Sequence, residues 1–158
     1  MNRELTVYLR TQATIAAAFN LCIGGLIASL IHHKADVVPA DAISIAIDLL
    51  ITCLLTAAIT TPFCRASLRR DKTGGVLPVK TSFARLLARL YRRPVLLCVS
   101  IGVGAALMLS ALAASVLALL GVTAVPFYLY IALKSVLCAA LGAFVTITVL
   151  YAGMCRAG

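Results

Sequence analysis

The polar groups with the clearest chemical potential in this sequence lie inside segments that are otherwise apolar. Asp48 lies within the apolar run 41–61, and Lys134 is the other charged residue inside an apolar run. Because a charge in hydrocarbon is costly, we expect each group to face other helices or a wet cavity and to have a partner. Such an acid can bind a cation or take up a proton, whereas a buried Asp–Lys pair can serve only to fix how two helices pack.

Other polar side chains share a helix face with Asp48. Residues four apart lie on one side of an α-helix, and the run 41–61 repeats polar residues at about this spacing: Asp41, Ser44, Asp48, Thr52, Thr56 and Thr60. Threonine in a membrane helix can also bond to the carbonyl four residues earlier. Asn20, near the middle of the run 11–31, can contact a solute or form a hydrogen bond between helices. The candidate substrate- or ion-binding residues are therefore Asp48, Lys134, Asn20, Thr52 and Thr56.

The sequence contains no motif for a catalytic, metal or cofactor site. The patterns H-E-x-x-H and G-x-S-x-G are absent, and no paired acids stand at catalytic spacing. His32, His33, Asp36 and Asp41 could bind a metal, but adjacent residues at a helix end do not face one site. The six cysteines form no C-x-x-C pair, which argues against zinc. All six lie within apolar spans or at their inner ends, where cysteine behaves as a small apolar residue, and this argues against a disulfide framework. We therefore expect no enzymatic activity, no metal and no cofactor.

Composition and length define the elements that must position these residues. The chain has 158 residues, of which 63% are hydrophobic, whereas soluble domains are about half apolar. At about 20 residues for each membrane crossing, this length allows four helices and one sizeable loop. We predict an all-α, polytopic membrane protein with a single membrane domain over residues 1–158. Its spans are expected at about 12–32, 41–62, 94–121 and 127–151, with Pro62 ending the second and Pro94 opening the third.

Small residues recur at intervals of four on two of the predicted spans. One such line is Ala16, Asn20, Gly24 and Ala28, and another is Lys134, Cys138, Gly142 and Thr146. Small side chains at this spacing allow membrane helices to approach closely. The first line therefore predicts tight helix packing, and the second is again a face of small or polar residues.

The charge distribution predicts how the chain sits in the membrane. The formal net charge is +9, but without a soluble module to carry it we do not expect nucleic-acid binding. Twelve Lys or Arg residues lie in the N-terminal segment, the loop 64–93 and the C-terminal segment, and Lys34 alone lies in the two opposite loops. Because basic segments stay on the cytoplasmic side, both termini should be cytoplasmic in a bacterial plasma membrane.

The basic loop 64–93 contains a predicted amphipathic, interfacial helix. Its apolar residues recur at helical spacing after a cap at Thr81 or Ser82: Phe83, Leu86, Leu87, Leu90 and Tyr91. Its basic residues lie mostly on the other face and are predicted to contact lipid headgroups: Arg85, Arg89, Arg92 and Arg93. Such a helix suits the surface of an anionic inner leaflet, and the alternative is ordinary basic flanking without a regulatory role.

The four spans are predicted to form two hairpins of the same orientation. Each hairpin has a proline in its outer turn, Pro39 or Pro126, and each ends in Cys-Arg-Ala. Asp48 lies nine residues after Pro39, and Lys134 lies eight residues after Pro126. The two charges should therefore sit at equal depth, about 10–12 Å below the outer helix ends. This pattern is typical of a parallel internal repeat with its axis along the membrane normal.

The segments AFNLCIGGLIASLI and DAISIAIDLLITCLLTAAITTPFCRASLRR, with the second hairpin, resemble small four-helix bacterial membrane proteins loosely called permeases. The resemblance implies membrane residence. Two functions remain open. One is a subunit that transports a small solute or ion, favoured because the polar line continues past Asp48 for three turns. The other is a non-catalytic accessory or assembly subunit with a structural Asp48–Lys134 pair. Four helices barely enclose a path, so a homo-oligomer or a membrane partner protein is expected.

Overall fold

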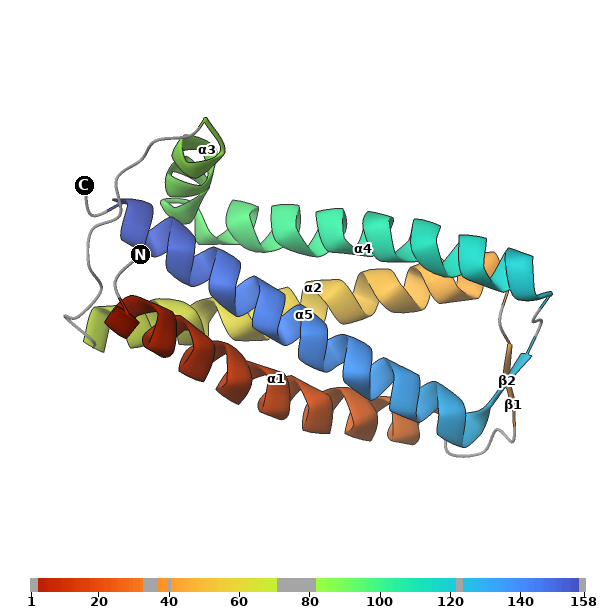
Figure 1. Cartoon of the computed structure of the whole chain (residues 1–158). Helices are drawn as coiled ribbons and strands as arrows, with labels where there is room; N and C mark the ends of the chain where they lie inside the picture. Colours follow the sequence, from red (N-terminus) through yellow and green to blue (C-terminus); the bar gives the residue numbers. More distant parts are fainter. Residues whose placement is uncertain (1–2, 33–36, 40, 71–81, 122–123, 157–158) are drawn as a thin grey trace.

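Four long helices dominate the structure, a computed structural model that describes residues 3–32, 37–39, 41–70, 82–121 and 124–156. They are α1 (Arg3–His32), α2 (Ala42–Arg70), α4 (Pro94–Leu120) and α5 (Phe127–Arg156). Between them are the short helix α3 (Ser82–Tyr91) and the strands β1 (Val37–Pro39) and β2 (Ala124–Pro126). All four long helices are long and apolar enough to cross a membrane, and they pack as a bundle (Figure 1). The all-α, four-span fold is confirmed.

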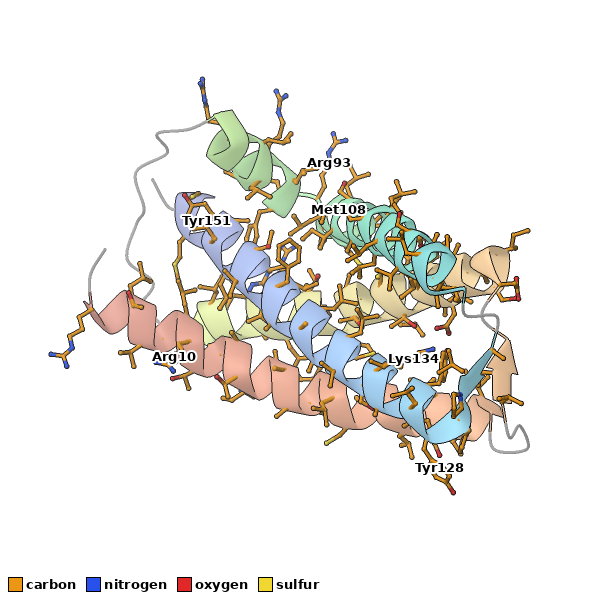
Figure 2. All side chains as sticks on the ribbon, turned by 45° about the vertical axis from the view of Figure 1, so that its right-hand side comes forward. Arg10, Arg93, Met108, Tyr128, Lys134 and Tyr151 are labelled. Carbon is orange, nitrogen blue, oxygen red and sulfur yellow. The ribbon has the colours of Figure 1, made fainter. Side chains whose placement is uncertain are left out.

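The helices of each hairpin pack mainly against the other hairpin. α1 lies along α5, α2 lies along α4, and α2 also contacts α5, whereas α1 and α2 contact each other little. Both chain ends and α3 gather at one end of the bundle (Figure 1). We call this the basic end, because exposed arginines such as Arg10 and Arg93 lie there (Figure 2). The two strands lie at the opposite end, which we call the ribbon end (Figure 1).

The turns that join the two helices of each hairpin pair as a short antiparallel ribbon. Val38 of β1 lies opposite Val125 of β2 at the centre of the pairing, and Val38 is buried. We expected only turns at these places. β-Branched residues favour strands, but three residues form a strand only when packing brings a partner alongside, and the sequence does not show that neighbour. The ribbon ties the two hairpins together at these turns.

Asp41 caps the N-terminus of α2. Its carboxylate accepts a 2.9 Å hydrogen bond from the backbone N–H of Ser44, and this bond lowers the pKa of Asp41 below its usual range. Its backbone carbonyl accepts a further bond from the N–H of Ile45. Asp41 and Ser44 are both exposed, so they do not belong to the buried part of the polar line on α2.

α2 does not end at Pro62, where we expected the second span to stop. The helix continues through Pro62 to Arg70. Proline has no N–H and cannot bond to the carbonyl of Ala58, but a membrane helix can continue past such a gap when neighbouring helices hold it. α2 packs against both α4 and α5. This tertiary packing is information that the local sequence does not contain.

α3 uses part of its apolar face to pack on the bundle. Leu87 and Tyr91 are buried in a cluster that includes residues of α4 and α5. We had expected the whole apolar face to lie on a membrane surface. This part of the face instead packs on the bundle. Leu86, at 53% exposed, stays on the outside. The side chain of Phe83 and the predicted cap at Thr81 lie outside the described residues.

The two lines of small residues meet between α1 and α5. A Cβ added at Gly24 would lie 2.6 Å from Cβ of Cys138, and one added at Gly142 would lie 2.8 Å from Cγ of Asn20. Non-bonded carbon atoms rest at about 3.5–4.0 Å, so neither position has room for a side chain. The predicted close packing is confirmed at this interface.

Candidate functional site

A polar network joins α2 to α5 near the ribbon end. Lys134 Nζ forms an ion pair with Oδ1 of Asp48, and Tyr130 Oη donates a 2.8 Å hydrogen bond to Oδ2 of the same carboxylate. Lys134 Nζ also donates to Tyr130 Oη at 3.3 Å. The Lys134 side chain is 6% exposed and that of Asp48 is 30% exposed. The ammonium group is therefore the more deeply buried charge, and both carboxylate oxygens have a partner.

The positions at which α2 and α5 begin place these two charges side by side. Asp48 lies about two turns into α2, and Lys134 lies about two turns into α5. Both helices begin shortly after the ribbon, which holds their starting points together. The predicted pairing of Asp48 and Lys134 is confirmed. A role in binding a substrate or an ion stays a prediction.

Tyr130 belongs to this network, and sequence reasoning missed it as a site residue. It lies four residues before Lys134, so both side chains lie on one face of α5. That spacing from a buried lysine was the signal that could have identified it. Its phenol occupies one oxygen of Asp48, which leaves less of the carboxylate available to a solute.

Asn20 lies away from the ion pair. Its amide nitrogen donates to a backbone carbonyl of α1 at 2.8 Å and to Oγ1 of Thr60 at 3.4 Å, and so links α1 to α2. Thr60 lies twelve residues beyond Asp48, a rise of about 18 Å. Thr52 and Thr56 are buried on the helix between them. The predicted residues thus form an ion pair and an amide contact at the two ends of a buried line, and not one compact site.

A cavity of about 440 Å³ lies between α1 and α2 in the basic half of the bundle. Asn20 and Thr60 line it toward the middle of the bundle, and Gln12, Ser67 and Arg70 line it toward the basic end. Much of the remaining wall is apolar. We call this the α1–α2 cavity. It reaches the amide contact but is not lined by the ion pair.

A second cavity, of about 690 Å³, lies between α2 and α4 in the same half, and we call it the α2–α4 cavity. Its polar lining comes from α2 and part of its apolar wall from α4: Thr61, Arg65, Arg69, Arg70, Val95 and Val99. In the part of the chain that the structure describes, neither cavity is lined by Asp48, Lys134, Thr52 or Thr56. These two cavities are therefore separate from the charged pair.

The arginines that we expected to contact lipid headgroups lie on the outside of the basic end. Arg85 and Arg89 are exposed on α3, and Arg92 and Arg93 are exposed in the turn that follows it. Figure 2 shows Arg93 where α3 and α4 meet. These positions allow contact with a membrane surface, and that contact stays a prediction.

The cysteines and acids of the described residues do not form a metal-type cluster. Over the ranges given above, no group of three His, Cys, Asp or Glu side chains comes together. All six cysteines are free thiols, and Cys53, Cys64, Cys138 and Cys155 are buried. His33 and Asp36, which we had considered as metal ligands, lie outside the described residues.

Comparison of the chain with protein-family models, with curated proteins and with solved structures gave no match. The resemblance to permease-type membrane proteins therefore assigns no family. Function must be argued from the geometry of the ion pair, the buried polar line and the two cavities.

Proposed function

We propose that this chain is a non-catalytic membrane subunit in which Asp48 and Lys134 form a structural ion pair. The proposal rests on the observation that the polar groups of the pair find their partners within one network. Both carboxylate oxygens and the ammonium group are engaged by one another and by Tyr130. Such a subunit would act by associating with lipid, with a membrane partner or with a second copy of itself.

The surroundings of the pair support a structural role. An ammonium group as deeply buried as that of Lys134 needs a counter-charge, and Asp48 supplies it. A transported solute needs space beside the groups that bind it, whereas the two cavities described above are lined by other residues. The pair connects the outer turns of α2 and α5 and so fixes how these two helices pack, a known use of buried polar groups.

Transport is the second candidate, and one observation favours it. Thr52, Thr56 and Thr60 are all buried along α2, between the ion pair and the α1–α2 cavity. An acid inside a membrane helix is typical of proton and ion pathways, and here buried hydroxyl groups continue from it along the helix. The contact of Thr60 with Asn20 also gives part of this line a packing role.

Ion flux through the reconstituted protein distinguishes the two candidates. We expect proteoliposomes of the parent chain to take up no more H⁺, Na⁺ or K⁺ than protein-free liposomes under an imposed potential. The reason is that the carboxylate and the ammonium group already bind each other and Tyr130. An Arg10→Gln variant at an exposed position controls for surface charge. A flux in the parent that disappears in a folded Asp48→Asn/Lys134→Met double variant would establish transport and contradict the structural proposal.

We further propose that the basic end faces the cytoplasm, with both termini on that side. Support comes from the exposed arginines at this end, which the positive-inside rule places in the cytoplasm. The test uses a chain in which the exposed Cys22 is replaced by Ala. A membrane-impermeant maleimide should label Val37→Cys, at the ribbon end, in intact cells and Arg89→Cys, on α3, only after lysis. The reverse labelling pattern would invert the orientation.

A further inference from the structure

A residue with an unpartnered hydroxyl group lines the α2–α4 cavity. Thr61 is 2% exposed, yet its Oγ1 makes no hydrogen bond. Other hydroxyls of the long helices bond to the carbonyl four residues earlier at 2.8–2.9 Å: Thr14, Ser115, Ser135 and Thr148. A buried polar group without a partner costs free energy. Thr61 lines the cavity, so its unpartnered hydroxyl lies in the wall of a space that a ligand could occupy.

The guanidinium group of Arg65 gives the same cavity a second donor. Its Nη1 is buried and has no hydrogen-bond partner. Its Cζ lies 4.8 Å from the centroid of the Tyr91 ring, so the aromatic face on α3 holds the group in place. The planar fork of arginine stays charged and matches the oxygens of a phosphate or a carboxylate. A guanidinium that is held in place with a buried N–H unpaired is suited to an anion.

The charges that line the α2–α4 cavity are of one sign. Arg65, Arg69 and Arg70 contribute to the lining, and no Asp or Glu of the described ranges does. Val95 and Val99 of α4 form an apolar wall and are 72% and 45% exposed. The cavity therefore combines a cationic part with an apolar surface that continues to the outside of the bundle. This combination matches a ligand with an anionic head and an apolar tail.

Helix packing places this cavity near the basic end. Further toward the ribbon end, Gly102 of α4 lies tightly against α2, where an added Cβ would lie 2.9 Å from Cδ2 and 3.2 Å from Cα of Leu54. Toward the basic end, the same two helices leave about 690 Å³ between them. The arginines of this cavity lie in the last turns of α2. That is the level at which a spanning helix meets the headgroups of a bilayer.

We propose that the α2–α4 cavity binds the phosphate group of an anionic phospholipid. Arg65 and Thr61 donate hydrogen bonds to the phosphate oxygens, Arg69 adds positive charge, and the acyl chains lie along Val95 and Val99. Charge-assisted bonds from arginine to phosphate are among the stronger polar contacts, and basic pockets between membrane helices suit such headgroups. This site shares no residue with the Asp48–Lys134 network, so it stands independently of the proposed structural role of that pair.

Lipid binding to the purified full-length chain tests the proposal. In a zwitterionic detergent, thermal unfolding can be followed by the labelling of the buried cysteines with a fluorescent thiol reagent. We expect phosphatidylglycerol to raise the unfolding midpoint and phosphatidylcholine at the same concentration to leave it unchanged. Inorganic phosphate in large excess should neither raise the midpoint nor displace the lipid. If phosphate alone reproduces the effect, the site takes free phosphate and the assignment to a lipid is wrong.

Two variants and two matched controls locate the site. Arg65→Gln and Thr61→Val should each weaken phosphatidylglycerol binding about tenfold, because each removes a donor to the phosphate. Thr61→Val should also raise the midpoint of the lipid-free protein, since it removes an unpartnered buried hydroxyl. A residue with a packing role alone would not combine a stability gain with a binding loss.

The controls are substitutions of the same types at positions outside the cavity. Thr148→Val removes a hydroxyl that is paired with the carbonyl of Phe144, and Arg10→Gln removes an exposed charge on α1. Both controls should bind the lipid as the parent does. Parent-like binding by Thr61→Val, or an equal loss in Arg10→Gln, would overturn the proposal. Because Thr61→Val is nearly isosteric, it gives a result even if Arg65→Gln does not fold.

Discussion

An Asp48→Asn variant is expected to be about 3 kcal/mol less stable than the parent chain. The substitution keeps the size of the side chain but removes the counter-charge of Lys134, whose side chain is 6% exposed. Lys134→Met should cost less, because the Asp48 side chain is 30% exposed and keeps the hydrogen bond from Tyr130. The difference in depth between the two charges thus predicts the order of the two single variants.

A double-mutant cycle measures this coupling. Unfolding in detergent can be followed by labelling of the buried cysteines, and the Asp48→Asn/Lys134→Met variant should recover most of the lost stability because no charge remains buried. Tyr130→Phe removes a polar contact without removing a charge, and it should cost about 1 kcal/mol. If both single variants are as stable as the parent, the pair does not stabilise the bundle and the structural proposal fails.

A Gly142→Val substitution is expected to destabilise the protein by about 3 kcal/mol or to prevent folding. An added Cβ would lie 2.8 Å from Cγ of Asn20 and 3.0 Å from the carbonyl oxygen of Ala16. The carbonyl belongs to the backbone of α1 and cannot move without displacing the helix. Relief would require α1 to move away from α5, and the bond from Asn20 to Thr60 would be lost with it.

Gly104→Val is the matched control for this prediction. Gly104 lies on the exposed side of α4, and an added Cβ there would meet no atom within 4 Å. Both variants replace glycine by valine in a long apolar helix. A difference in their stability therefore reports on helix contact alone. Equal stability of the Gly142→Val and Gly104→Val variants would mean that α1 and α5 are not in close contact at Gly142.

The long helices and the ion pair could be predicted from the sequence because residue types and their positions along each span are enough to indicate them. Apolar length defines a span, and Pro94 opens α4 as its position indicated. Asp48 and Lys134 were predicted partners because each was the isolated charge of its span at a matched depth. Burial of Thr52 and Thr56 followed from their place on the same helix face.

The remaining features depend on contacts between distant segments. The polar line on α2 marks a buried face, but it does not say whether α1, α4 or α5 covers that face. For the same reason the ribbon and the continuation of α2 past Pro62 were missed. Each hairpin packs against the other, with α1 on α5 and α4 on α2, and this arrangement is compatible with the internal repeat. That repeat stays a prediction.

The placement of the ribbon has a mechanical consequence. The ribbon and the ion pair hold the helices together at one end, whereas both cavities lie in the other half. α1 has 30 residues, so it is about 45 Å long, and a rotation of about 5° about the ribbon end moves its far end by about 4 Å. α1 and α2 share few contacts, but α1 packs closely on α5 and Asn20 bonds to Thr60 of α2, so the α1–α2 cavity can widen only if α1 and α5 turn together away from α2. Because the ribbon and the ion pair lie at one end, a small turn of these helices about the ribbon end would displace Asp48 from Lys134 much less than it would change the width of the α1–α2 cavity, which lies at the far end.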